Sequence, residues 1–289
     1  MVGSVLAALL VSASPASAGP HNPTGDFVNF SNCPLSKSTV FLCVYSESSG
    51  GFFTIGKKTV PIVSPVVLQG GLDQPTEAEE SKGEAPFLAA EDGNTLVKTP
   101  QPVPGGLLGV TAPSWWPQIL KDLFNETINN GFTGVTATVE LAAPASAIKL
   151  NSANLVNGTG TALSLPAKIK LSNPFLGNNC YIGTNSKPIV FEFTSGTTSP
   201  PPPNTPISGD PGELSFNEAG TVLTFSGGKL VNNSFAAPGA NGCGGFLFSW
   251  LVDPFVNSIV GTPSPAGTNT AILEGKIQVA NPAAVRASE

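Results

Sequence analysis

Side chains able to carry out catalysis are scarce in this 289-residue chain, which contains a single histidine, His21. His21 lies in the segment His21-Asn22-Pro23-Thr24-Gly25, whose composition is typical of a flexible tail. The body of the chain therefore lacks the imidazole that a Ser-His-Asp triad, a Cys-His pair or a histidine zinc site requires. No GxSxG, HExxH or SxxK motif is present either. We predict that the protein is not an enzyme.

Carboxylates alone could still hydrolyse a glycosidic bond, provided that two of them lie about 5 to 9 Å apart. The candidates are Glu140, Glu192, Asp210, Glu213, Glu218, Asp253 and Glu274. Glu140 and Glu192 fall on polar strand faces, and Asp253 is better explained as a helix N-cap. A carboxylate-only glycoside hydrolase is therefore a weak alternative.

An acidic stretch, Glu91-Asp92-Gly93-Asn94, offers oxygen ligands for Ca²⁺. It lacks the alternating acids and the distal Glu of an EF-hand loop. We predict an acidic solvated loop there, with no metal and no cofactor.

Two adjacent aromatic residues, Trp115 and Trp116, are the best candidates for a ligand platform. Indole rings offer a large apolar face and a polar N–H, which suits stacking on a sugar ring. The competing interpretation is that both rings plug a core at the start of a helix. A module that binds a cell-surface glycan through these rings, or a lipid held between sheet and helix, is our alternative function.

The N-terminal residues resemble an export signal. An apolar run from Val2 to Val11 is followed by Ala16-Ser17-Ala18, a small-x-small cleavage pattern, although no Lys or Arg precedes the run. We predict a signal peptide over 1–18 and a single secreted β-rich domain over 19–289, which is extracellular and could associate with the cell envelope. No transmembrane helix is expected, because the apolar run from Phe246 to Val260 is shorter than a bilayer span and contains Asp253 and Pro254.

The four cysteines, Cys33, Cys43, Cys180 and Cys243, form an even set, which in an exported chain indicates two disulfides. Three pairings are open. We favour Cys33 with Cys43, since a sequence separation of ten residues allows a hairpin or tight loop, and therefore Cys180 with Cys243. A zinc site is disfavoured because the spacing contains no CxxC.

Composition indicates an all-β protein. Charged residues make up 11% of the chain, with 32 Gly and 28 Pro, which is typical of many short strands joined by turns. The net charge of −6 disfavours binding to nucleic acid and to anionic membrane surfaces. The oligomeric state is left open by the sequence.

Alternating apolar residues predict strands over 133–141, 163–171 and 189–193. Shorter strands are predicted over 27–30, 40–45, 52–55, 59–63, 66–69, 214–216, 222–225, 229–231 and 271–279. One helix is predicted from Ser114 to Gly131, and a second from Asp253 as N-cap, with Pro254 at N1, to Gly261. We expect Pro166 to mark an edge or a bulge. The fold class is mainly β, an antiparallel β-sandwich or distorted barrel with one or two short helices.

Two long loops are predicted within this domain. Residues 73–106 carry seven of the nineteen acidic residues and are interpreted as an acidic loop. Residues 197–206 contain the proline run Pro200 to Pro203 and form a proline-rich loop, which lies between Cys180 and Cys243. If those two cysteines pair, the loop is an excursion from one domain and not a boundary between two.

Two segments, Phe53 to Ile62 with Val67 to Gly71, and Gly261 to Ala271, resemble parts of uncharacterised secreted proteins of actinobacteria. The resemblance covers the two ends of the chain better than its middle, and it implies export and a bacterial source but no activity. Our leading functional hypothesis is a secreted, non-catalytic extracellular or cell-envelope-associated protein with a structural or surface-interaction role.

Overall fold

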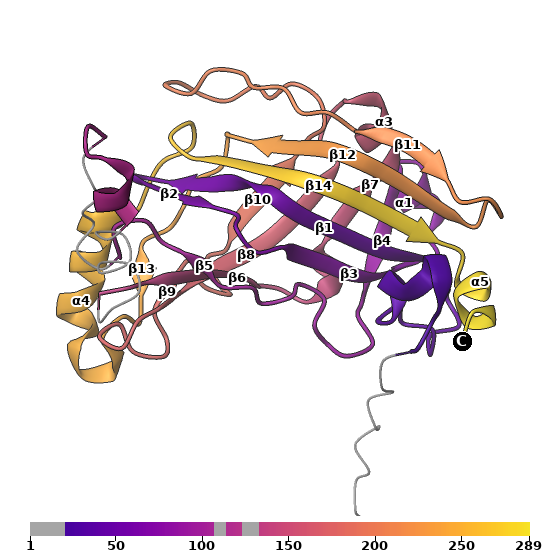
Figure 1. Ribbon diagram of the computed structural model, residues 1–289, viewed down its shortest axis with the longest axis horizontal. Coiled ribbons are helices and arrows are strands. Elements are labelled where there is room, and N and C mark those ends of the chain that lie inside the picture. Colours follow the sequence, from indigo (N-terminus) through magenta and orange to yellow (C-terminus); the bar gives the residue numbers. More distant parts are fainter. Residues whose placement is uncertain (1–20, 107–113, 123–132) are drawn as a thin grey trace, which may run out of the picture.

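A computed structural model describes residues 21–106, 114–122 and 133–289 (Figure 1). The chain is mainly β, as predicted. The strands are β1 (Val40–Ile55), β2 (Lys58–Pro61), β3 (Val66–Asp73), β4 (Glu84–Ala89), β5 (Gln101–Pro102), β6 (Thr136–Leu141), β7 (Lys149–Asn151), β8 (Leu163–Ser172), β9 (Tyr181–Ile182), β10 (Ile189–Phe193), β11 (Glu213–Phe216), β12 (Val222–Asn232), β13 (Ala240–Asn241) and β14 (Thr270–Ala280). The helices are η1 (Gly25–Phe30), α1 (Glu77–Glu80), η3 (Ala145–Ala147), α3 (Ser152–Asn157), α4 (Gly245–Val260) and α5 (Pro282–Ala287).

All of these strand pairings are antiparallel and form one sheet with the order β11-β12-β14-β1-β3-β4-β7-β8-β6-β5. The sheet bends over on itself, so that the layer containing β12, β14, β1 and β3 faces the layer containing β8, β6 and β10 (Figure 1). Strand β4 connects the layers, because its last residues pair with β3 and its first residues pair with β7. The sheet is not closed, so the architecture corresponds to the predicted β-sandwich and not to the predicted barrel.

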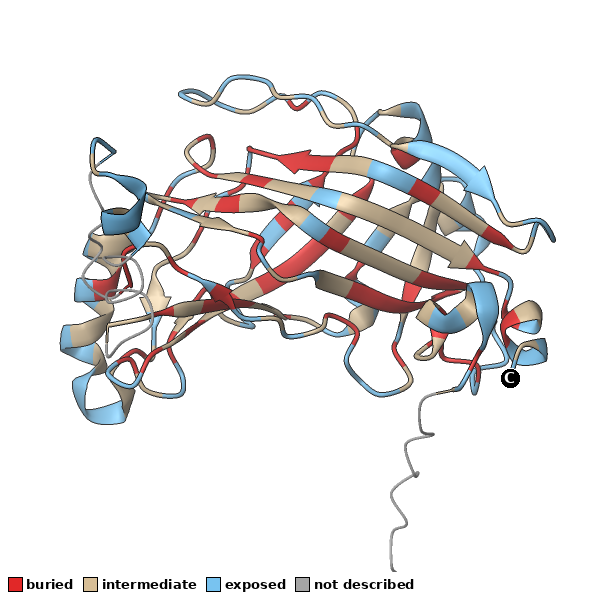
Figure 2. Cartoon of the chain, viewed as in Figure 1, coloured by how far each residue is buried: buried red, intermediate tan, exposed pale blue. Residues whose placement is uncertain are grey.

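The core lies between the two layers (Figure 2). Every second residue of β8 and β10 is buried, which confirms the alternation predicted for these strands. Phe191 packs its ring against Phe53 of the opposite layer and against Phe235, with centroid distances of 5.5 and 4.8 Å. Burying an aromatic side chain of this size stabilises the fold by about 1.5 to 3 kcal/mol, so this cluster is a major link between the layers.

Several predicted short strands join into longer ones. The pairs predicted over 40–45 and 52–55, and over 222–225 and 229–231, lie within the single strands β1 and β12. Each strand has a bulge between its two predicted segments, between Ser48 and Gly50 in β1 and between Phe225 and Gly228 in β12. Gly275 of β14 lies between these bulges, where a Cβ atom would overlap the backbone carbonyl of Glu47. Only glycine permits this close approach of the strands.

Pro166 does not mark an edge, since β8 is paired on both sides. The backbone of Pro166 faces the gap between the end of β6 and the start of β7, where Ala142 donates to its carbonyl at 3.1 Å. The missing N–H of proline is therefore not needed by a partner strand.

Both favoured disulfides are confirmed. Cys33 is bonded to Cys43 and Cys180 to Cys243, with sequence separations of 10 and 63 residues. The first bond fastens the N-terminal segment to the start of β1, and the second fastens β9 to the loop that leads into α4. On the chain-entropy argument the second, longer loop gives the larger stabilisation.

Three other predictions are wrong. Residues 27–30 belong to the 3₁₀ helix η1, because the segment turns back to reach the Cys33–Cys43 bond. Residues 73–106 are not a loop throughout, since they contain α1, β4 and β5. The segment at His21 is held, with His21 Nδ1 at 2.7 Å from a carboxylate oxygen of Glu289 and the Thr24 N–H donating to the carbonyl of Ser288.

The proline-rich loop leaves and returns to the same side of the molecule, with Thr197 bridged to Ser208. Asn204 at its tip donates through Nδ2 to the carbonyl oxygens of Asn233 and Asn269, at 2.8 and 2.9 Å. The predicted signal peptide, 1–18, lies outside the described residues.

Candidate functional site

One end of the sandwich is covered by α4, which is the longest helix in the described part of the chain (Figure 1). The helix begins at Gly245, two residues after Cys243, and ends before Gly261, whose φ of 80° provides the left-handed C-cap at the end that the sequence predicted. Asp253 accepts hydrogen bonds from the N–H groups of Cys243 and Gly242 at 2.7 and 3.2 Å. These contacts fasten the helix to the disulfide loop.

The predicted start of this helix, with Asp253 as N-cap and Pro254 at N1, is wrong by nine residues. The helix begins at Gly245, and Pro254 lies in its interior, where it cannot donate to the carbonyl of Trp250. The true start has no side-chain cap, since Gly244 precedes it in a left-handed conformation. Because the usual start signals are absent, only the continuous apolar run from residue 246 onward could have indicated the longer helix.

The face of α4 that points away from the sheet is unusually apolar. Phe246 is 97% exposed and Trp250 is 75% exposed, whereas Val256 on the opposite face is only 4% exposed. The large apolar side chains exposed on the helix are Phe246, Leu247, Phe248, Trp250, Leu251 and Phe255. We call this set the α4 apolar face. Burial of Phe255, which the sequence predicted, is therefore wrong.

Charge is almost absent from this helix. Asp253 is the only charged residue between Gly245 and Val260, and its carboxylate is directed to the disulfide loop. A helix that is apolar around its whole circumference normally has both faces covered. Contiguous exposed apolar surface usually marks a site that contacts a lipid or another protein.

The short segment 114–122, which contains the predicted ligand platform, lies at the same end of the molecule as α4 (Figure 1). Trp115 is 79% exposed, and its ring centroid is 6.2 Å from that of Trp116, with an interplanar angle of 85°. The rings are perpendicular, so they do not form one flat stacking surface. Residues 118–122 are helical, with Ile119 and Leu120 exposed, and the remainder of the helix predicted to reach Gly131 lies outside the described residues.

Two small apolar cavities lie behind α4, with volumes of about 50 and 40 Å³. The first lies between the layers, against β1, β2, β6 and β8, and the second lies against α4. They share four lining residues, namely Lys58, Val103, Leu171 and Val260. The cavities are therefore adjacent, and we refer to them together as the interlayer cavity.

Among the described residues, Lys58 is the only titratable one that lines either part of the interlayer cavity. It begins β2, is half-buried, and burial lowers the pKa of its ammonium group. The other polar residue, Gln101, has its side-chain atoms engaged, since Oε1 accepts from Val63 and Ser64 and Nε2 donates to the carbonyl of Ser64. Lys58 is thus the polar group that could meet a ligand there.

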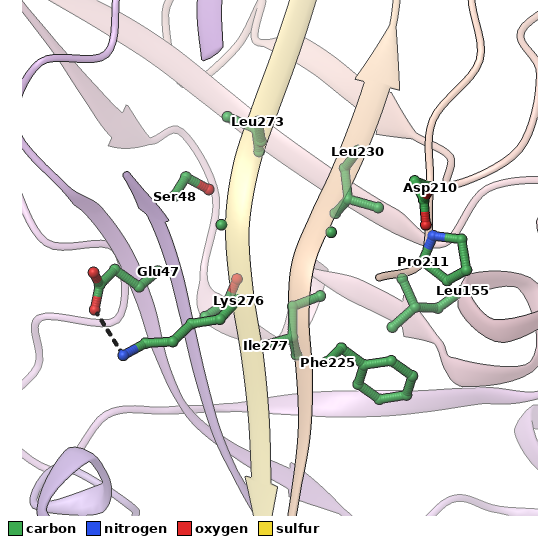
Figure 3. Close-up of a pocket in the computed structure, with 13 residues that line it drawn as sticks. Glu47, Ser48, Leu155, Asp210, Pro211, Phe225, Leu230, Leu273, Lys276 and Ile277 are labelled. Atoms are coloured by element: carbon green, nitrogen blue, oxygen red, sulfur yellow. Dashed lines mark ion pairs between the residues drawn. The ribbon is translucent and has the colours of Figure 1, made fainter. Parts of the chain in front are cut away.

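A second hollow lies over the outer face of β1, β14 and β12, at the aligned bulges. This groove measures about 700 Å³ and is lined by Glu47, Asp210, Glu274, Lys229 and Lys276, together with glycines. Figure 3 shows the smaller pocket beneath it, in which Glu47 and Lys276 form an ion pair of 3.5 Å and Asp210 approaches from beyond β12.

The groove brings together two of the predicted carboxylates, Asp210 and Glu274, and adds Glu47, which the sequence did not single out. Internal contacts occupy two of them. Glu47 Oε2 accepts from the Tyr45 hydroxyl at 2.8 Å as well as pairing with Lys276, and Asp210 accepts from the Gly212 N–H at 2.8 Å. The arrangement resembles a salt-bridged polar sheet face more than an acid–base pair.

The other candidate acids do not join the groove. Glu140 accepts from the Tyr181 hydroxyl at 3.4 Å and lies 4.0 Å from Lys98. At the acidic stretch from Glu91 to Asn94, Asp92 accepts from the N–H of Asn94 in a tight turn. Within the described residues, no three His, Cys, Asp or Glu side chains cluster as metal ligands would.

No protein family, curated protein or solved structure matches this chain. Among the described helices, none combines the length and the apolar character needed to cross a membrane. The two disulfides and this finding are compatible with an extracellular protein.

Proposed function

We propose that the protein is a secreted, non-catalytic, envelope-associated protein that attaches to a lipid surface through its α4 end. The observation that carries this proposal is the α4 apolar face, six large exposed side chains on a helix whose one carboxylate is turned away from them. Export is part of the proposal and is supported by the two disulfides.

The chemistry of the α4 apolar face favours lipid over a sugar or a soluble partner. Phenylalanine and tryptophan are the residues that interfacial helices place at the boundary between headgroups and acyl chains. The helix spans 16 residues, or about 24 Å at 1.5 Å per residue, and it can lie in the plane of such a boundary. A glycan site would need several polar groups among the aromatic rings, and the side chains of the α4 apolar face offer only the indole N–H of Trp250.

The distribution of charge is consistent with this orientation. Lys57 lies next to the helix, since its N–H donates to Val260 at 2.7 Å and its Nζ to the carbonyl of Ser258 at 3.4 Å. The acidic helix α1 lies at the other end of the molecule (Figure 1). Although the net charge of −6 disfavours anionic membranes, the charge-free α4 apolar face suits a zwitterionic lipid surface.

The test is flotation of the purified, disulfide-bonded protein with phosphatidylcholine vesicles. Full burial of a Phe or Trp side chain is worth about 1.5 to 3 kcal/mol. Replacing both Phe246 and Trp250 with serine should therefore cost at least about 3 kcal/mol, which is roughly a hundredfold loss in vesicle affinity. The matched control replaces Leu214 and Phe216, two exposed apolar residues of β11, with serine and should leave binding unchanged.

Two outcomes would overturn the proposal. The first is a parent protein that does not float with vesicles. The second is a parent protein that sediments as a dimer which the Phe246→Ser, Trp250→Ser variant disrupts, with no vesicle binding in either form, because the α4 apolar face would then contact a second copy of the chain.

A further inference from the structure

We propose that the interlayer cavity is the binding site for the acyl chain of a fatty acid, with the ammonium group of Lys58 contacting the fatty-acid carboxylate. This inference rests on the proposed function in one respect only, namely that the α4 end meets lipid. The site itself is separate from the α4 apolar face and lies on the inner side of the helix.

The lining of the cavity matches an acyl chain. Its walls come from both layers and from α4, and they are formed by Phe53, Ile55, Val60, Ala137, Val139 and Ile169, among others. Among the described residues that line the cavity, the only polar side chain besides Lys58 is Gln101, whose amide is already hydrogen-bonded to the backbone of residues 63 and 64. A polar ligand would find no free partner among these residues except Lys58, whereas a hydrocarbon chain would lose only its contact with water.

The position of Lys58 selects the headgroup. Lys58 lines both parts of the cavity and follows the Gly56–Lys57 turn that lies beside the end of α4. Because Lys58 is half-buried, its ammonium group is partly desolvated, and a nearby carboxylate stabilises its charge more than it would stabilise that of an exposed lysine. A single carboxylate at this point would allow the attached chain to run between the layers.

The size of the cavity limits the chain. About 90 Å³ in two adjacent parts, of 50 and 40 Å³, is below the roughly 150 Å³ of an apolar cavity that accepts benzene. Only a few methylene groups fit without movement, and a longer chain requires α4 to shift outward. Val256, Ile259 and Val260 form the α4 side of the second part, so a shift of this helix would enlarge it directly.

The experiment is calorimetric titration of the full, disulfide-bonded protein with decanoate below its micelle concentration, and with decanol as an uncharged probe of equal length. We expect saturable binding of decanoate at one site per chain. Lys58→Gln should weaken decanoate binding at least tenfold and leave decanol binding unchanged, because only the charge contact is removed.

A second variant tests the cavity itself. Ala137 of β6 lines the first part of the cavity and is buried, and Ala137→Val adds two methyl groups there in a residue that strands favour. We expect this variant to keep the melting temperature of the parent and to lose at least tenfold in affinity for both probes. Absence of binding in the parent, or unchanged binding in a folded Ala137→Val variant, would overturn the inference.

The two proposals fail separately. The Phe246→Ser, Trp250→Ser variant should lose vesicle binding and keep decanoate binding, whereas Ala137→Val should do the reverse. Loss of both activities in either variant, with the fold intact by circular dichroism, would show that the cavity and the α4 apolar face are not independent sites and would refute the separate acyl-chain site.

Discussion

Asn269 joins three segments at the α4 end, and its replacement by alanine should destabilise the whole fold. The residue is 0% exposed and makes four side-chain hydrogen bonds. Oδ1 accepts from the Gly56 N–H at 2.9 Å and the Ser264 hydroxyl at 2.7 Å. Nδ2 donates to the carbonyl oxygens of Phe235 and Pro265 at 2.9 and 3.1 Å.

The size of the effect follows from these contacts. A satisfied hydrogen bond is worth about 1 kcal/mol net, and a buried polar group left without a partner costs about 1 to 3 kcal/mol. Four bonds are lost in Asn269→Ala, and the surrounding backbone can relax or admit water at some of them. We therefore expect the free energy of unfolding to fall by about 3 to 5 kcal/mol.

Urea unfolding at pH 7 with both disulfides intact measures this loss. With a slope of about 3 kcal/mol per molar urea, suited to a chain of this size, the midpoint should fall by about 1 to 1.7 M. Asn269→Asp should be no more stable than the alanine variant, since its second oxygen faces two carbonyl oxygens. Asn94→Ala, an exposed asparagine in a surface turn, is the control and should change stability by less than about 0.5 kcal/mol.

A urea midpoint for Asn269→Ala within about 0.2 M of the parent would refute this reasoning. At the slope given above, it would correspond to a loss of at most about 0.6 kcal/mol in the free energy of unfolding. It would mean that the four hydrogen bonds are replaced at no cost, and that Asn269 does not hold the β1–β2 turn against the segment that precedes β14.

Three further outcomes are expected. Replacing both Cys180 and Cys243 with alanine should lower the free energy of unfolding by about 4 kcal/mol on the chain-entropy argument, and an effect below 1 kcal/mol in urea unfolding would contradict it. The pKa of the Tyr45 phenol should be about 12, because burial raises it most and the hydrogen bond and charge of Glu47 raise it further. Absorbance titration should show the Tyr45 pKa of the Glu47→Gln variant shifted part of the way back toward 10, when the other tyrosine is replaced by phenylalanine in both the parent and the variant. Hydrogen bonds from the backbone and side chain of Thr76 lower the pKa of Glu79. The stabilisation of α1 by ionised Glu79 is therefore present above the ordinary glutamate pKa and is lost as the pH falls through the lowered pKa. A carboxylate NMR titration of Glu79 with a midpoint at or above 4.5 would contradict this.

The elements that could be predicted from sequence are those set by local patterns. Alternation in β8 and β10 predicted which side chains are buried, because a strand places successive residues on opposite faces whatever lies around it. The favoured cysteine pairing was also correct, since two cysteines separated by ten residues can be brought together by one local loop.

The features that were missed depend on contacts between distant segments. Separate strands were predicted over 40–45 and 52–55, but β1 continues through a bulge because β14 lies beside it and pairs with it on both sides of the irregularity. Strand β4 was not predicted, because it lies in an acidic stretch and its pairing with β3 and β7 forms only when the sheet bends. Glu47 was missed for the same reason, because its place in the groove beside Asp210 and Glu274 depends on the pairing of β1 with β14.

The sequence by itself determined that this chain forms antiparallel strands, pairs its cysteines and lacks the imidazole groups of common catalytic sites, because these properties depend on residue type, spacing and local alternation. The tertiary structure decided which apolar residues remain exposed. Phe246 and Val256 belong to one predominantly apolar run, and only the placement of α4 across the end of the sandwich buries Val256 against the core and leaves Phe246 facing outward. Exposure is a property of the folded arrangement, and the proposed lipid contact rests on it.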